Sequence, residues 1–176
     1  MKKVCVIMLA LLVLFAFVGC ATKSNDAPAA DDWWNNPPAD TADYHFEVGF
    51  AKGSNLQTSR DWAKANANQY LAQYVSNSVE SIVTTYVNDA GELASNNMQS
   101  LQAFESVSKQ NASAVLTGVT FKFAQADGGV YALAQLPIGE LAEKLKEQAK
   151  ESFQKNAAAT AAMDAMDQAI DKYFTK

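Results

Sequence analysis

The chain has 176 residues, with 14 Lys and Arg against 19 Asp and Glu, and its formal net charge is −5. This acidic balance disfavours nucleic-acid binding, which depends on clustered positive charge. The length suits one domain with a hydrophobic core of its own, and only two cysteines are present, so we expect no disulfide framework.

The first 19 residues have the pattern of a secretion signal. Lys2 and Lys3 precede an apolar stretch over residues 4–18, and the small residue Gly19 comes directly before Cys20. Charge, apolar run and small residue are the three parts of a cleavable signal. We therefore expect residues 1–19 to be a signal peptide, with cleavage between Gly19 and Cys20.

The residues that end at Cys20 resemble the bacterial lipoprotein box, in which the cysteine sulfur receives a diacylglyceryl group before processing. Phe17 departs from that box, where leucine is usual. The alternatives are an ordinary cleaved signal with an incidental cysteine, or an uncleaved membrane anchor, although residues 4–18 are short for a transmembrane helix of about 20 residues. We predict Cys20 as the lipid attachment site, since two or three acyl chains would hold the protein on a membrane.

Residues 20–42 are expected to be a lipidated tether between the membrane and the folded domain. They are rich in Ala, Asp, Asn and Pro and lack apolar periodicity. Trp33 and Trp34 are too aromatic for a pure linker. They would dock either on the protein's own domain or at the membrane interface, where an apolar ring with one N–H donor is suited.

The domain starts with an alternating segment. Tyr44, Phe46, Val48 and Phe50 recur at every second position, which predicts a strand with these four side chains in the core and His45 pointing away from it. A helix of some 30 residues follows, beginning at a capping box of Ser54 and Gln57, and its interleaved alanines should let it lie close to the strands.

A second helix is expected over residues 92–112 and a strand over residues 115–124. The segment Asp127-Gly128-Gly129 is a hairpin turn signal, because glycine accepts positive φ values. The returning strand, residues 130–136, should stop at Pro137, which has no N–H for the ladder.

Residues 138–176 read as a long, charged C-terminal helix. Its first half should pack on the domain, and its second half, residues 154–176, would either fold back or protrude toward a partner such as a second copy of the chain. The expected fold class is α+β, with a small antiparallel three-stranded sheet (strand, two helices, β-hairpin, long C-terminal helix) and helices packed on one face.

Three segments in this order resemble the LPP-twenty family of bacterial envelope lipoproteins. They are Asp32-Trp-Trp-Asn-Asn-Pro-Pro38, the strand Tyr44 to Ala51 with its Val48-Gly49-Phe50-Ala51 centre, and the hairpin Gly118 to Leu136. The resemblance implies an LPP-twenty-like α+β domain over residues 43–153, similar to domains of flagellum-associated envelope proteins. It brings no catalytic residues, and the tail after Leu145 departs from it.

The sequence offers little for catalysis. His45 is the single histidine, and neither a Ser/His/Asp set nor a metal-ligand spacing surrounds it. His45 and Glu47 could bind a metal weakly from one strand face, but a solvated face is the simpler interpretation. We expect no enzyme activity, no catalytic or metal site and no cofactor.

The expected function is that of a lipid-anchored, non-catalytic binding or assembly module at the bacterial outer membrane or cell surface. Its partners would be the membrane, through acylated Cys20, and other envelope proteins, with a homo-oligomer through the C-terminal helix as a further option. Ala21 after the cysteine favours outer-membrane sorting by analogy. The alternatives are a periplasm-facing carrier of an apolar ligand, and an envelope hydrolase, which the lack of a second histidine disfavours.

Overall fold

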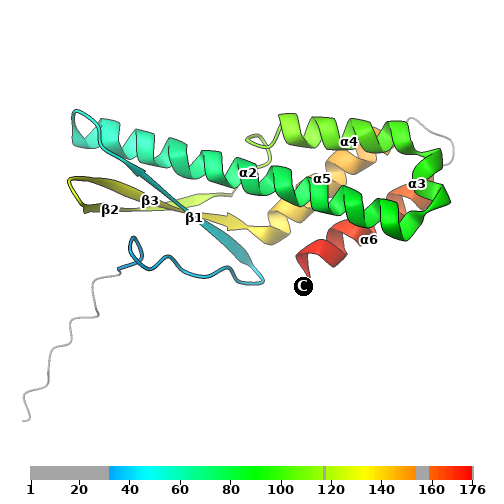
Figure 1. Cartoon of the computed structure of the whole chain (residues 1–176), viewed down its shortest axis with the longest axis horizontal. Helices are drawn as coiled ribbons and strands as arrows, with labels where there is room; N and C mark the ends of the chain where they lie inside the picture. Colours follow the sequence, from blue (N-terminus) through cyan, green and yellow to red (C-terminus); the bar gives the residue numbers. More distant parts are fainter. Residues whose placement is uncertain (1–31, 117, 154–158, 176) are drawn as a thin grey trace, which may run out of the picture. The chain divides into compact units, whose positions relative to one another are not determined.

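The computed structural model describes residues 32–116, 118–153 and 159–175. Within them, a three-stranded antiparallel sheet and five helices follow in the order β1-α2-α3-α4-β2-β3-α5-α6 (Figure 1). The predicted α+β class, with helices packed against an antiparallel three-stranded sheet, is confirmed.

The sheet has the strand order β1-β3-β2, with β1 at Tyr44–Ala51, β2 at Thr120–Ala126 and β3 at Gly129–Pro137. The predicted hairpin is present: Ala126 pairs with Gly129, and the two residues between them have φ values of 55° at Asp127 and 72° at Gly128. Positive φ at both central positions is the type I′ arrangement that matches the twist of paired strands. The first strand of the hairpin begins at Thr120 and not at residue 115 as predicted, because the Val115 N–H donates to Asn111 O in the turn after α4. Pro137 ends β3, and α5 begins at the next residue.

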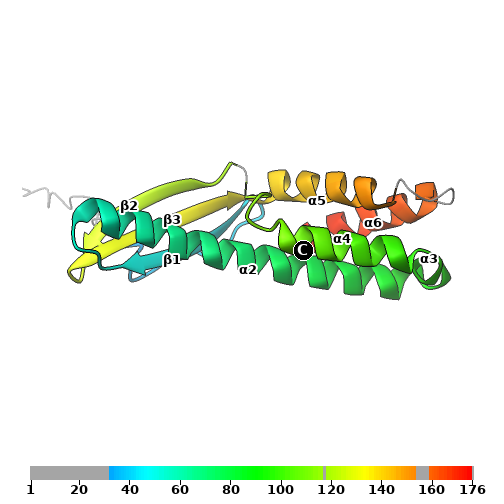
Figure 2. The same ribbon diagram turned by 90° about the horizontal axis from the view of Figure 1, so that it is seen from above.

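Helix α2, Leu56–Ala90, is 35 residues long, or about 50 Å at 1.5 Å per residue. Its first half lies along the sheet and its second half extends beyond it (Figures 1 and 2). The helix begins one residue later than the predicted capping box, because the Asn55 side chain, rather than Ser54, accepts the hydrogen bond from the Thr58 N–H.

The face of β1 that meets α2 is opposite to the predicted one. A Cβ added at Gly49 would lie 2.2 Å from Ala63 O and 2.4 Å from Ala67 N, so the backbone of α2 runs directly over Gly49. Tyr44, Phe46, Val48 and Phe50 therefore lie on the other face, where none of them is fully buried. The helix packs on the face that carries Gly49 and Ala51, because only small side chains let a helix lie this close to a strand.

Small residues continue this contact surface across the sheet. Gly49 pairs with Ala132, and Glu47 with Ala134, and both alanines are fully buried. On the helix side, Ala63 and Ala67 are fully buried too. The prediction that alanines let the helix lie close to the strands is thus confirmed.

The second predicted helix is two helices, α3 at Glu92–Asn96 and α4 at Met98–Gln110. Asn97 separates them, is 2% exposed, and uses its side-chain Nδ2 to donate to Leu93 O. An asparagine side chain that bonds to the backbone in this way offers the chain an alternative to continued helix.

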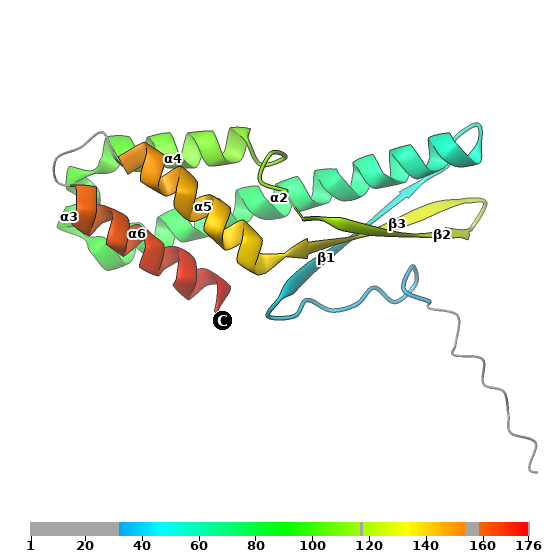
Figure 3. The ribbon, with the colours of Figure 1, turned by 180° about the vertical axis from the view of Figure 1, so that it is seen from behind.

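The C-terminal residues form α5 at Ile138–Phe153 and α6 at Ala159–Phe174. Figure 3 shows α6 running back beside α5, and Lys146 Nζ on α5 lies 2.7 Å from Asp171 Oδ1 on α6. Of the two options for this segment, the structure has the folded-back one. The apolar residues Ala162, Met166, Ala169 and Ile170 are at most 3% exposed.

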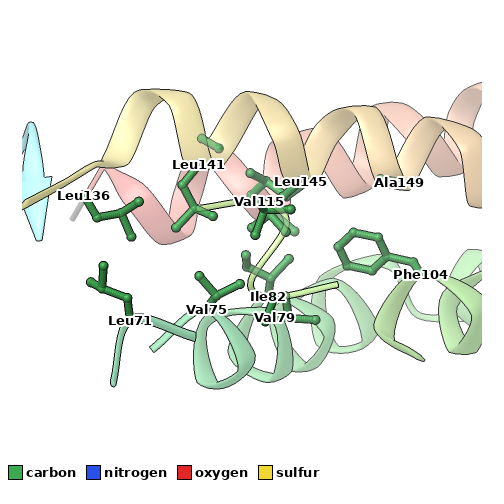
Figure 4. Close-up of a cluster of buried hydrophobic side chains, with 14 of the residues drawn as sticks. Leu71, Val75, Val79, Ile82, Phe104, Val115, Leu136, Leu141, Leu145 and Ala149 are labelled. Carbon is green, nitrogen blue, oxygen red and sulfur yellow. The ribbon is translucent and has the colours of Figure 1, made fainter. Parts of the chain in front are cut away.

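The helices α2, α4, α5 and α6 form a four-helix arrangement in which each packs on two neighbours. Figure 4 shows its core, with side chains of α2 facing those of α5 and with Phe104 of α4 beside them. The core is continuous with the helix-facing side of the sheet through Leu136. The labelled members of this core are Leu71, Val75, Val79, Ile82, Phe104, Val115, Leu136, Leu141, Leu145 and Ala149.

The compact unit begins at Trp33, so residues 33–42 of the expected tether belong to it. They run on the side of the sheet opposite α2 (Figures 1 and 2). Trp33 and Trp34 are half-buried and pack edge to face, with ring centroids 5.9 Å apart.

Candidate functional site

The strongest candidate site lies around His45, near the start of β1. His45 shares the helix-facing side of β1 with Gly49 and is 8% exposed. Its ring stacks on Tyr74 of α2, with centroids 3.6 Å apart and an interplanar angle of 11°. The expectation that His45 points to solvent is wrong, for the same reason that the whole strand face is reversed.

Two carboxylates hold the His45 ring by its opposite edges. Nδ1 lies 2.7 Å from Asp40 Oδ2 and Nε2 lies 3.2 Å from Glu47 Oε1. Asp40 Oδ1 also accepts the Phe46 N–H at 3.1 Å. Ionised carboxylates can only accept hydrogen bonds, so both contacts are hydrogen bonds at once only when both ring nitrogens carry protons.

The loop that supplies Asp40 is fixed by further bonds to the elements around it. The Thr41 N–H donates to Tyr44 O at 2.9 Å, and Thr41 Oγ1 accepts the Tyr44 N–H at 3.0 Å. The Ile138 N–H, at the start of α5, donates to Asp43 O at 2.9 Å. Residues 40–43 are therefore held by both β1 and α5.

A cavity of about 440 Å³ opens between this loop, β1, α2 and the ends of α5 and α6. Aromatic rings dominate its wall, and Asp40 is the carboxylate among its lining residues. Tyr173 and Phe174 close one side and pack edge to face, with ring centroids 4.9 Å apart. The lining residues within the described ranges are Asp40, Thr41, Ala42, Tyr44, His45, Tyr74, Ile138, Tyr173 and Phe174. A volume of this size falls in the range of small-molecule sites.

Tyr74 presents a protonated hydroxyl in this cavity over a wide pH range. Burial, and after it the nearby Tyr173, raises the pKa of Tyr74 to about 12. Burial has this effect because it disfavours the charged phenolate. The Tyr74 phenolate therefore forms only at a higher pH than the phenolate of an ordinary tyrosine.

Both ring nitrogens of His45 face carboxylates. Asp40 and Glu47 lie at opposite edges of the His45 ring. In the less favoured interpretation of the sequence, His45 and Glu47 would bind a metal ion weakly, but here Nε2 of His45 faces the Glu47 carboxylate itself. In the described part of the chain, no group of three or more metal-ligating side chains could hold a metal ion.

Cys20, the one site residue predicted from the sequence, lies outside the described residues. The cavity around His45 was not predicted. The sequence does contain one signal for it. Gly49 and Ala51 lie on the same face of the strand as His45, and their small size marks this face as the one that a helix can approach. The aromatic residues Tyr173 and Phe174 join the site through the folding back of α6.

None of the helices within the described ranges is long and apolar enough to cross a membrane. Comparison of the chain with family models, with curated proteins and with solved structures gives no match. The resemblance to the LPP-twenty family therefore stays a prediction from the sequence.

Proposed function

We propose that this protein is a lipid-anchored lipoprotein of the bacterial envelope and acts as a non-catalytic binding or assembly module at the outer membrane or cell surface. The anchor is the acylated Cys20. The binding element is the cavity around His45, which we call the aromatic cavity. Membership of the LPP-twenty family is part of the same proposal.

The observation that carries the binding role is the position of the aromatic cavity. Residues 40–42, which follow the start of the folded unit at Trp33, line it. A ligand seated there would contact the anchored segment, the sheet and the helices together. Five of the nine lining residues that the structure describes carry rings, and aromatic side chains supply large contact areas in binding sites.

The alternative role, a carrier with an apolar ligand between the sheet and the long helix, gains no support from the helix–sheet contact. At Gly49 there is no room even for one added carbon beside Ala63 and Ala67. The buried alanines on both sides of this contact make the same point. A ligand would have to separate α2 from β1.

In situ photo-crosslinking tests the proposal. A photoreactive residue replaces Ala42, on the rim of the aromatic cavity, or Val87, which is 38% exposed and does not line the cavity. We expect a discrete adduct from position 42 in native membranes, none from position 87, and loss of the adduct when Cys20→Ser removes the anchor. Equal adducts from both positions, or none from position 42, would contradict the binding role.

A further inference from the structure

We infer that the aromatic cavity binds an organic cation, such as a quaternary ammonium group. This inference rests on the proposed function and names the chemical class of its ligand. The argument comes from the charge of the cavity wall, from the kind of side chain that lines it and from the contacts that position both.

The part of the wall that the structure describes contains a carboxylate and no Lys or Arg. Asp40 lines the cavity with a side chain that is 56% exposed, and none of the described lining residues is Lys or Arg. His45 is the one lining group that can become positive, and its ring is held between Asp40 and Glu47. Even with both ring nitrogens protonated, these three side chains together stay negative.

The aromatic rings of the lining residues can attract a bulky organic cation. Aromatic faces carry partial negative charge and attract cations within about 6 Å, most strongly where water is excluded. Tyr44, Tyr173 and Phe174 are partly exposed at the cavity, and Tyr74 adds a further ring to its lining. Aromatic cages that recognise methylated ammonium groups are also lined by several aromatic side chains.

A metal ion or an uncharged apolar molecule fits less well. Hard metal ions need several converging oxygen ligands, whereas Asp40 is the only carboxylate among the lining residues that the structure describes. An apolar molecule would cover Asp40 and give no charge in return, which costs free energy. An ammonium group surrounded by methyl groups satisfies both the rings and the carboxylate.

The test compares choline with 3,3-dimethylbutan-1-ol, which has the same shape and no charge. The ligands are titrated by calorimetry into the mature, full-length protein extracted from membranes in a non-ionic detergent. We expect choline to bind at least tenfold more tightly than the neutral alcohol. Equal affinities, tighter binding of the alcohol, or no choline binding at millimolar concentration would overturn the inference.

Two variants and one control locate the binding. Tyr173→Leu removes a ring and Asp40→Asn removes the charge while keeping an oxygen acceptor, and each should weaken choline binding roughly three- to thirtyfold. Tyr70→Leu removes an aromatic residue that is 47% exposed and does not line the cavity, so it should leave the affinity unchanged. A uniform effect of all three would contradict the assignment. If a variant fails to fold, the comparison of choline and alcohol on the unaltered chain still decides.

Glycerophosphocholine separates two sources of the same ammonium group. Tighter binding of glycerophosphocholine than of choline would indicate a lipid headgroup, and the reverse would indicate a free organic cation. Either order supports a cation site. Failure of choline and glycerophosphocholine alike, with the crosslink from position 42 intact, would reject the cation while leaving the proposed binding role standing.

Discussion

At the scale of single residues, the aromatic cavity depends on a glycine that does not line it. Gly49 lies two positions beyond Glu47 and four beyond His45 on the same side of β1. Because α2 can approach the strand at Gly49, Tyr74 of the same helix comes to stack on His45. One small residue thus decides which face of the strand is covered and where the histidine lies.

Gly49→Ala should destabilise the protein. The added Cβ would meet backbone atoms of α2, Ala63 O and Ala67 N, which cannot rotate away. Overpacking of this kind costs about 1–3 kcal/mol of unfolding free energy, measurable by urea unfolding followed by circular dichroism.

Gly139→Ala is the matched control for Gly49→Ala. Nothing lies within 4 Å of a Cβ added at Gly139, in the first turn of α5, so the exchange should be neutral or stabilising by up to about 1 kcal/mol. Equal effects of the two exchanges would show that α2 does not lie against Gly49.

The raised pKa of Tyr74 predicts that the folded protein loses stability at high pH. The ordinary pKa of tyrosine is 10.0, and the pKa of Tyr74 in the folded chain is about 12. Above pH 10 the unfolded chain therefore releases the Tyr74 proton while the folded chain keeps it. The free energy of unfolding should fall as the pH rises from about 10 to about 12.

Urea unfolding at several pH values, with Tyr74→Phe for comparison, measures this effect. Phenylalanine has no proton to lose, so its curve should fall less steeply above pH 10. Parallel curves for the two proteins would mean that the Tyr74 hydroxyl is not held in its protonated form.

At the scale of elements, α6 completes both the helical core and the cavity. Lys146 Nζ on α5 lies 2.7 Å from Asp171 Oδ1 and 3.2 Å from Glu143 Oε1, and Lys172 Nζ lies 2.7 Å from Asp89 Oδ2 on α2. The apolar residues of α6 are buried between the same two helices. These apolar residues, through which the C-terminal helix would join a second copy, are therefore covered within the chain. The homo-oligomer stays a prediction from the sequence.

Ile170→Ala tests whether α6 packs as described. Ile170 is fully buried, and the loss of a buried isoleucine side chain costs about 2–5 kcal/mol. Chemical unfolding should show a loss of that size. Lys172→Ala, two residues further on, breaks only an exposed ion pair and should cost about 1 kcal/mol or less. If Ile170→Ala proves as mild as Lys172→Ala, α6 does not hold to α2 and α5 in solution.

Most elements could be predicted from the sequence because their signals are local. The hairpin turn at Asp127 and Gly128, the long helix after Asn55 and the α+β class all follow from short-range patterns. The alternation in β1 correctly groups Tyr44 with Phe50, but it does not say which side meets the helix. That choice depends on how closely α2 approaches, which is a property of the packed pair of elements.

The aromatic cavity escaped prediction because its parts are distant in the sequence. Asp40, Tyr74 and Tyr173 come from a loop and two helices, and they meet only after α6 has folded back. The single histidine was noticed, but its partner Asp40 lies in a segment that reads as a linker. A site assembled by long-range packing leaves no spacing that a sequence motif could capture.

At the scale of the whole molecule, the proposed function combines a membrane anchor at Cys20 with a binding cavity in the folded unit. The folded unit begins at Trp33, and Cys20 precedes it in the chain. Residues 40–43 bind to β1 and to the start of α5, so the segment that we propose is anchored ends at the aromatic cavity. Binding at the aromatic cavity would therefore occur close to the point of attachment along the chain.

The central claim is that Cys20 carries lipid, and the intact mass of the protein purified from membranes tests it most directly. We predict a chain that starts at Cys20, heavier than its amino acids by a diacylglyceryl group and an added acyl chain, and unacylated protein from Cys20→Ser. A purified chain that keeps residues 1–19, or one with an unmodified Cys20, would contradict the account.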